Sequence, residues 1–129
     1  MKDVAVREYM SALPHSIGSD QTLGVAHAMM RKHSIRHLPV LAGGKLLGLV
    51  SDRDLRFIET FKDVDQNQVR VDEAMSVDVY QIEPRTPLAR VASEMAERKL
   101  GSAVVMEGPK VVGILTTTDI CRALADALR

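Results

Sequence analysis

The sequence is poor in aromatic residues, has a single cysteine and carries no net charge. Aromatic residues make up 3% of the 129 residues and tryptophan is absent, which argues against a nucleic-acid platform of exposed rings. Lys plus Arg and Asp plus Glu number 17 each, so no overall field attracts DNA or an anionic membrane. The single cysteine, Cys121, excludes an internal disulfide and a multi-cysteine zinc site.

Long hydrophobic runs are also missing. No segment approaches the length of a membrane span, and the charged residues Lys2, Asp3, Arg7 and Glu8 are unlike a signal peptide. We therefore expect a soluble, cytoplasmic protein that binds neither nucleic acid nor membrane. Apolar residues still make up 46%, which is typical of a packed domain of ordinary size.

What the sequence does have is an internal repeat with a constant offset of 65 residues. The identical pairs are Val6/Val71, Glu8/Glu73, Met10/Met75, Ser11/Ser76, Ile17/Ile82, Leu23/Leu88, Met30/Met95, Val40/Val105, Gly43/Gly108, Lys45/Lys110, Gly48/Gly113 and Asp54/Asp119. The register has no gap, so it predicts two copies of one folding unit, packed about a pseudo-twofold axis. Two copies are too few for an open solenoid.

Each copy predicts the element order β-α-β-β-α, and the whole chain predicts an α/β fold with some α+β character. A helical turn (4–10, 69–75) and an extended piece (15–17, 79–82) precede an amphipathic helix that begins at Leu23 or Leu88. Hairpins follow (38–50, 103–115), then a last helix (51–61, 116–128). We expect repeat 1 over residues 1–61, a polar connector over 62–70 and repeat 2 over 71–129.

Several local features refine this prediction. Gly43-Gly44 predicts a tight two-residue turn, because both positions accept positive φ. The nearly continuous apolar strands predict burial on both faces, and Pro39 predicts an edge position or the start of a strand. In the last helix, Ile120, Leu124 and Leu128 are expected to form the buried face.

The end of each hairpin carries the same short signature. Gly48-Leu49-Val50-Ser51-Asp52-Arg53-Asp54 recurs as Gly113-Ile114-Leu115-Thr116-Thr117-Thr118-Asp119. With the Val-x-x-x-Met-Ser openings and the segment Ile35-Arg36-His37-Leu38-Pro39-Val40, two such repeats resemble a tandem pair of cystathionine-β-synthase (CBS) domains, the Bateman module. The resemblance covers nearly the whole chain, so a stand-alone CBS pair is expected.

The resemblance implies a regulatory ligand rather than a reaction. It implies an adenine nucleotide or adenosyl ligand, such as AMP, ADP, ATP, NAD or S-adenosylmethionine, in the cleft between the repeats, and it leaves the choice among these open. No other cofactor is expected. It also implies a homodimer, with an effector protein as a possible further partner. The expected mechanism is a population shift, in which the ligand favours one orientation of the repeats.

The signature also has a physical logic. A strand ends and a helix begins at Ser51 and at Thr116, and unpaired N–H groups at a helix N-terminus suit a phosphate. The resemblance assigns the ribose hydroxyls to Asp54 and Asp119. Ile17 and Ile82 would form the apolar wall for the base, with Tyr80 beside it, and Gly48 and Gly113 would let backbone and ligand approach closely. The same Ser/Thr-x-x-Asp spacing is close to a helix capping box, which needs no ligand.

Basic residues distinguish the two copies. Arg36, His37 and Arg53 occur in the first copy, where the second has Gly101, Ser102 and Thr118. We therefore expect Arg36, His37, Arg53 and Thr118 among the ligand-binding residues, and two pockets of unequal phosphate affinity. The alternative is that the arginines are solvated surface charges.

Other functions remain as alternatives. The chain would serve only as an interaction or dimerisation module if the pockets stay empty and the signatures only cap helices. An enzyme is not expected, because His37 is the single plausible general base. A metal site is not expected either, because His33 should end a helix while His37 begins a strand.

Overall fold

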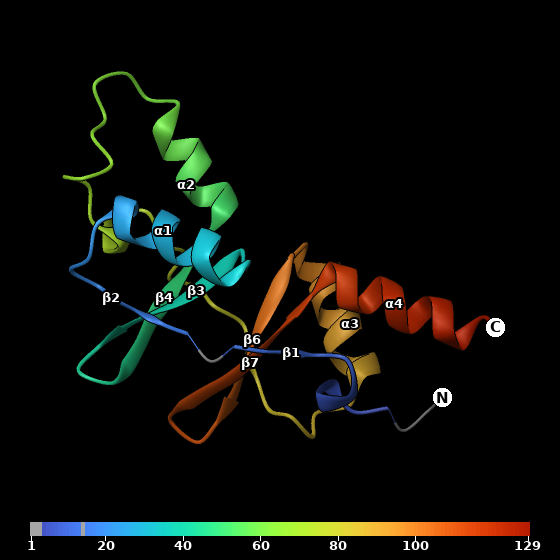
Figure 1. Ribbon diagram of the computed structural model, residues 1–129. Helices are drawn as coiled ribbons and strands as arrows, with labels where there is room; N and C mark the ends of the chain where they lie inside the picture. Colours follow the sequence, from blue (N-terminus) through green and yellow to red (C-terminus); the bar gives the residue numbers. More distant parts are fainter. Residues whose placement is uncertain (1–3, 14) are drawn as a thin grey trace. The chain divides into compact units, whose positions relative to one another are not determined.

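Figure 1 shows the computed structural model, which describes residues 4–13 and 15–129. Two compact units make up the chain. The central unit is His15–Val79, and the terminal unit joins Met1–Pro14 to Tyr80–Arg129. Each unit therefore combines the body of one repeat with the opening segment of the other. The repeat boundaries at 1–61 and 71–129 stay a prediction.

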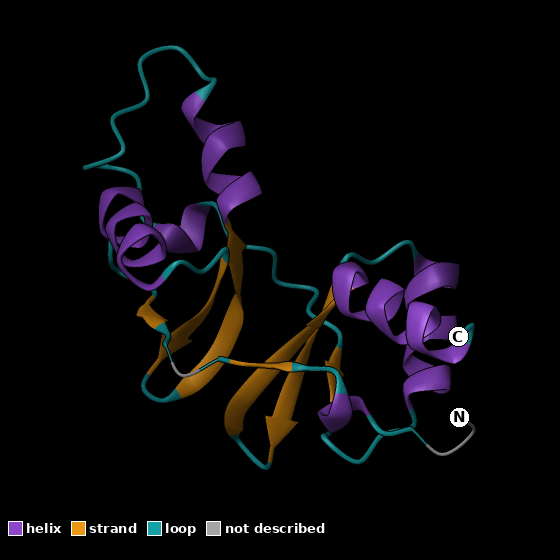
Figure 2. Cartoon of the chain, turned by 45° about the vertical axis from the view of Figure 1, so that its right-hand side comes forward, coloured by secondary structure: helices purple, strands orange, loops and turns teal. Residues whose placement is uncertain are grey.

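The central unit is a three-stranded sheet with helices on one side (Figures 1 and 2). Its elements are β2 (Ile17–Gly18), α1 (Leu23–His33), β3 (His37–Ala42), β4 (Lys45–Ser51), α2 (Asp52–Glu59) and the 3-10 helix η2 (Val71–Glu73). The strand order is β2-β3-β4, with β2 parallel and β4 antiparallel to β3.

The terminal unit repeats this plan with one further strand. Its elements are the 3-10 helix η1 (Val6–Glu8), β1 (Ser11–Ala12), β5 (Gln81–Ile82), α3 (Leu88–Arg98), β6 (Ser102–Glu107), β7 (Lys110–Thr116) and α4 (Thr117–Ala127). The order is β1-β7-β6-β5. The predicted α/β class and the predicted order of elements are confirmed.

The hairpins form as the glycines predict. Gly43 and Gly44 have φ angles of 56° and 80°, and Gly108 has 59°. Both hairpins also shift register at equivalent points, after Val40 and after Val105. The repeat is therefore maintained in irregular details of the backbone.

Each unit has its own hydrophobic core, and all but one of the buried members in each unit have an equivalent in the other. In the central unit the buried members are Ile17, Leu23, Ala26, Met30, Leu38, Val40, Val50, Leu55 and Val71. In the terminal unit they are Val6, Ile82, Leu88, Val91, Met95, Ala103, Val105, Leu115 and Ala123. Three consecutive residues of β3 and of β6 are buried, which confirms the predicted burial of both strand faces.

The opening segments are exchanged between the repeats. Val6 packs in the core of the terminal unit, although it opens repeat 1, and its N–H donates to the carbonyl of Thr86 at 2.9 Å. Val71 packs in the core of the central unit, and its N–H donates to the carbonyl of Gln21 at 2.8 Å. Thr86 and Gln21 are again 65 residues apart, so one contact is formed twice with the two partners swapped.

The position of Pro39 differs from the prediction. It lies inside β3, the middle strand of its sheet, and is fully buried. In the terminal unit the equivalent residue, Val104, donates its N–H to the carbonyl of Tyr80 at 2.8 Å. Proline has no such donor, and β2 is short enough to pair with β3 only from Val40 onward. A middle strand therefore accommodates proline where its neighbour has not yet begun pairing.

The predicted buried face of the last helix is wrong in its outer half. Leu124 is 58% exposed and Leu128 is 77% exposed, whereas Ala123 is buried and Ile120 only packs against the core. The helix contacts β7, and Figure 1 shows it continuing away from the sheet toward the C-terminus. The apolar spacing alone did not indicate where this contact ends.

Candidate functional site

A helix begins directly at the end of a strand in both units, as the signatures predict. In the central unit Ser51 ends β4 and caps α2. Its Oγ accepts from the N–H of Asp54 at 3.1 Å, while Asp54 Oδ2 accepts from the Ser51 N–H at 2.8 Å and from its hydroxyl at 2.9 Å. This reciprocal pattern is a capping box, which satisfies N–H groups that the helix leaves unpaired.

The terminal unit forms the same box. Asp119 Oδ2 accepts from the N–H of Thr116 at 2.8 Å, and Thr116 Oγ1 accepts from the N–H of Asp119 at 3.4 Å. Asp119 is 3% exposed, and its other oxygen, Oδ1, lies 3.3 Å from Nη1 of Arg122. The capping alternative is thus confirmed for both signatures. One oxygen of each carboxylate is used for the cap, which leaves Oδ1 to interact elsewhere.

His37 brings a titratable group to the junction in the central unit. It begins β3 and is paired across the sheet with Ser51. Burial lowers the pKa of His37, the nearby carboxylate of Asp54 opposes that shift, and Arg36 adds to it. Ser51 is in turn hydrogen-bonded to the carboxylate of Asp54. His37, Ser51 and Asp54 therefore form one polar cluster.

The two predicted arginines lie beside this cluster. Arg36 and Arg53 are both exposed, and the carbonyl of Arg36 accepts from the N–H of Asp52 at 2.9 Å. This bond ties the start of α2 to the start of β3. The cluster of His37, Ser51 and Asp54 thus has a positively charged margin.

The terminal unit has no such margin at the equivalent positions. Gly101, Ser102 and Thr118 stand there, and the carbonyl of Gly101 accepts from the N–H of Thr117 at 3.1 Å. The backbone tie is therefore the same as in the central unit, but the charge is missing. Thr118 is exposed on α4, where it contributes only a hydroxyl.

The predicted apolar wall is mostly core. Ile17 is 4% exposed and Ile82 is 6% exposed, and each packs in the hydrophobic cluster of its own unit. Tyr80 is half-buried, and the guanidinium carbon of Arg98 lies 5.3 Å from the centre of its ring. That distance is within cation–π range. A role for these three residues in ligand binding stays a prediction.

One pair of residues in the central unit was missed. His15 and His33 stack with ring centroids 3.7 Å apart and an interplanar angle of 16°. They occupy the positions equivalent to Tyr80 and Arg98, so the 65-residue offset was the signal that could have found them. Burial lowers the pKa of His33, and the positive charges of His15 and Lys32 add to this effect.

The two signature glycines are explained by chain packing. A Cβ on Gly48 would lie 2.5 Å from the carbonyl oxygen of Ser76, and one on Gly113 would lie 2.8 Å from that of Ser11. Distances this short are clashes with backbone atoms. The predicted close approach is therefore real, but the group that approaches is the exchanged opening segment rather than a ligand.

Metal ligands and membrane spans were also searched for. No group of three or more His, Cys, Asp or Glu side chains suited to a metal ion occurs within residues 4–13 and 15–129. In the same residues no helix combines the length and the apolar character needed to cross a bilayer.

Comparison with known proteins supports the family. The CBS domain model matches residues 6–59 and 71–126. The CBS domain-containing protein YhcV of Bacillus subtilis is 26% identical over 116 residues, which cover 90% of this chain and 82% of YhcV.

Two solved structures are also similar. The CBS domain pair of protein MJ0100, in complex with 5'-methylthioadenosine and S-adenosyl-L-methionine, is 27% identical with a TM-score of 0.82, over 96% of this chain and 98% of that one. Hypoxic Response Protein I, with two coordinated zinc ions, is 27% identical with a TM-score of 0.75, over 92% and 98%. The chain therefore belongs to the CBS domain family, as a pair of these regulatory modules.

Proposed function

We propose that this protein is a sensor that binds an adenine nucleotide or another adenosyl ligand at its strand-to-helix junctions. The observation that carries the proposal is the likeness to the MJ0100 pair, which extends over 96% of this chain and holds two adenosyl ligands. S-adenosylmethionine and methylthioadenosine are therefore as much candidates as AMP, ADP, ATP and NAD. The position between the repeats stays a prediction of the sequence.

The chemistry of the junctions supports this proposal. In the central unit, Asp54 Oδ1 is not used by the cap, so it is free to accept from ribose hydroxyls, and the hydroxyl of Ser51 and the imidazole of His37 stand beside it. Charge-assisted hydrogen bonds of a carboxylate to a diol are among the stronger ones. In the terminal unit, Asp119 and Thr116 form the same cap, but Asp119 Oδ1 is already paired with Arg122, and no arginine stands at the positions equivalent to Arg36 and Arg53.

Binding would act through the equilibrium between conformations. A ligand shifts that equilibrium only by the difference in its affinity for the two states. The signal then reaches a second copy of the chain or an effector protein, and we propose a homodimer as the working assembly. The absence of enzymatic activity and the cytoplasmic location stay predictions.

A thermal-shift panel tests the proposal. The six candidate ligands are added to the wild type and to the Asp54→Ala and Asp119→Ala variants. A ligand at a hundredfold excess over its dissociation constant stabilises the folded state by about 2.7 kcal/mol, so the melting temperature should rise for at least one ligand. The rise should disappear in at least one of the two variants.

A matched control separates binding from capping. Thr22 caps α1, its Oγ1 accepting from the N–H of Val25 at 3.4 Å, and it takes no part in either junction. Thr22→Ala should lower the melting temperature but keep the ligand-induced rise. If no ligand raises the melting temperature of the wild type, the sensor function is wrong.

One observation favours a second function, a ligand-free interaction module. Phe57 and Phe61, the two phenylalanines of the chain, are 62% and 50% exposed on one side of α2 and in its following turn, with ring centroids 5.2 Å apart. Exposed aromatic pairs are common at protein interfaces. Loss of self-association in Phe57→Ser, together with an empty ligand panel, would support this function.

A further inference from the structure

The histidines are distributed unequally between the two units. All four histidines of the chain belong to the central unit, namely His15, His27, His33 and His37. The equivalent residues of the terminal unit are Tyr80, Ala92, Arg98 and Ser102. Histidine is the side chain whose ordinary pKa, about 6.5, lies in the physiological range. A fall in pH from neutrality therefore changes the charge of the central unit more than that of the terminal unit.

Two of the four histidines are stacked face to face. The ring centroids of His15 and His33 are 3.7 Å apart, and the ring planes differ by 16°. His15 lies in the segment before β2, and His33 is the last residue of α1. Both residues are half-buried. The stack therefore connects the segment that leads into β2 with the end of the helix.

This stack accepts one proton but not two. When both rings are protonated, two positive charges face each other at stacking distance and repel. The two protonation steps are coupled, so the pair takes up its second proton at a lower pH than a single histidine would. In agreement with this, burial lowers the pKa of His33, and the positive charges of His15 and Lys32 lower it further.

The charged groups around the end of α1 do not offset the repulsion. On α1 itself, Arg31 and Lys32 precede His33 and carry the same sign of charge. On β3, which packs against α1, the one titratable residue is His37. The turn after β2 contributes Asp20, which acts on Arg70. The carboxylates of α2, which also packs against α1, all have other partners: Asp52 with Arg56, Asp54 with Ser51 and Glu59 with His27.

The equivalent contact in the terminal unit does not depend on pH. The guanidinium carbon of Arg98 lies 5.3 Å from the centre of the Tyr80 ring. Arginine stays charged and tyrosine stays neutral between pH 5 and pH 8, so nothing in this pair changes over that range. One turn earlier on α3, Glu94 Oε2 lies 3.5 Å from Nη1 of Arg98, whereas the equivalent residue of α1 is Met29. The central unit therefore lacks the carboxylate that supports a cation at this position.

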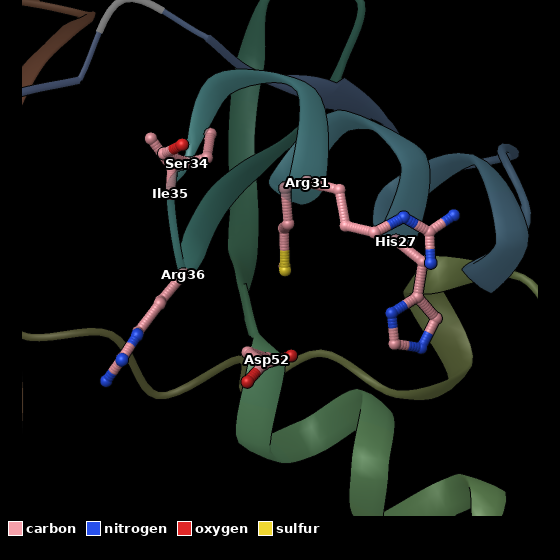
Figure 3. Close-up of a pocket in the computed structure, with 7 residues that line it drawn as sticks. His27, Arg31, Ser34, Ile35, Arg36 and Asp52 are labelled. Carbon is pink, nitrogen blue, oxygen red and sulfur yellow. The ribbon is translucent and has the colours of Figure 1, made fainter.

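His27 makes a different contact on the same helix. It lines a pocket of about 380 Å³ between the end of α1 and the start of α2 (Figure 3), and it pairs through Nε2 with Glu59. Neither His15 nor His33 lines that pocket. Protonation of His27 adds attraction to a carboxylate rather than repulsion from a second cation. His27 therefore offers a matched control for the stacked pair.

We propose that the His15–His33 stack is a pH-sensitive contact, which holds the segment before β2 against α1 while at least one ring is neutral and releases it when both are protonated. β2 pairs with β3 only through Ile17 and Gly18, at the edge of its sheet. The release therefore acts on the shortest strand of the central unit. Acidification loosens this unit and leaves the Tyr80–Arg98 contact intact. The inference does not depend on an adenosyl ligand.

Nuclear magnetic resonance of the full chain, titrated from pH 7.5 to pH 5, tests the proposal. Nuclear Overhauser effects between the His15 and His33 rings should be present at pH 7.5 and lost by pH 5, while those between Tyr80 and Arg98 remain. In His15→Gln the pKa of His33 should rise, because one of the charges that lower it is removed. His27→Gln removes a histidine outside the stack and should change neither result.

A double variant copies the pair of the terminal unit. With His15→Tyr and His33→Arg combined, the contact between positions 15 and 33 should persist at pH 5. Three results would overturn the proposal: ring contacts in the wild type that are as strong at pH 5 as at pH 7.5, an unchanged titration of His33 in His15→Gln, or loss of the contact at pH 5 in the double variant. The first of these uses the wild type alone, so the test remains decisive even if a variant does not fold.

Discussion

The central and terminal units share their backbone contacts and differ in the side chains that those contacts support. Both have a capping box at the strand-to-helix junction, a left-handed residue at the end of the first helix (Ser34 and Lys99), and a register shift in the hairpin. Only the central unit surrounds its junction with Arg36, His37 and Arg53. The two units therefore place the same capping groups at their junctions and differ in the charged side chains around them.

A second pair of positions shows the same division. His15 and His33 stack in the central unit, whereas Tyr80 and Arg98 form a cation–π contact in the terminal unit. In both cases a planar side chain before the first strand rests on the last turn of the helix. The contact is maintained while its chemistry changes, from two titratable rings to a ring and a permanent cation.

The largest expected effect comes from substituting Gly48 and Gly113, where the exchanged opening segment lies against each hairpin. A Cβ on Gly48 would also lie 2.8 Å from Met75 Sδ, and one on Gly113 would lie 3.0 Å from Met10 Sδ. Overpacking of this kind costs about 1–3 kcal/mol. We expect Gly48→Ala to cost about 3 kcal/mol and Gly113→Ala about 2 kcal/mol, measured by urea unfolding.

Gly101→Ala is the matched control, since a Cβ there meets no atom within 4 Å. It should change the free energy of unfolding by less than about 1 kcal/mol. Equal effects of all three substitutions would show that the exchanged segments do not press on the hairpins.

The next effect sharpens the difference in charge between the two junctions. AMP should bind the central unit more tightly than the terminal unit, because the charges of Arg36 and Arg53 favour its phosphate. Asp54→Asn should therefore weaken AMP binding about tenfold or more, and Asp119→Asn should have less effect. Calorimetry measures the affinity of each variant for AMP and for methylthioadenosine, which has no phosphate. Equal losses of AMP affinity in the two variants would contradict a charge-based preference.

Loss of the helix cap should reduce the free energy of unfolding equally in both units. Ser51→Ala and Thr116→Ala each remove an oxygen that accepts from the third helical N–H, at 3.1 and 3.4 Å. We expect about 1 kcal/mol for each, read from thermal unfolding. A loss of stability in only one of the two variants would mean that the same capping geometry stabilises the two units unequally.

A proline substitution tests the difference between β3 and β6. Val104→Pro would remove the N–H that donates to the carbonyl of Tyr80 at 2.8 Å and would copy the situation at Pro39. We expect a loss of about 1 kcal/mol, the net value of one such hydrogen bond. Chemical denaturation measures it, and a loss several times larger would show that β6 depends on a bond that β3 does without.

The smallest effect is a difference in pH dependence. The pKa of His37 is lowered in the folded state, so protonation favours unfolding. Its contribution to the free energy of unfolding is fully present above about pH 6.5, the pKa of histidine in an unfolded chain, and is lost as the pH falls below that value. His37→Gln should lose less stability than the wild type between pH 7.5 and pH 5.5, by urea unfolding. Identical pH profiles would show that His37 is not held in its neutral form.

The sequence predicted the local structure well because local structure depends on neighbours along the chain. The two glycines of the first turn, the apolar stripe of Leu88, Val91 and Met95, and the Ser/Thr-x-x-Asp caps all act within a few residues. The site was predicted only in part. Ser51 and Asp54 are hydrogen-bonded and His37 is paired across the sheet with Ser51, but the core positions of Ile17 and Ile82 depend on packing that no short pattern encodes.

By itself, then, the sequence determined the repeat, the elements, their caps and the difference in charge at the two junctions. Only the tertiary structure decided which opening segment packs against which hairpin. Val6 and Val71 are identical residues in equivalent settings, so local energetics favour neither partner for either one. The exchange is a choice between two nearly equal packings, and such a choice is made by the path of the whole chain.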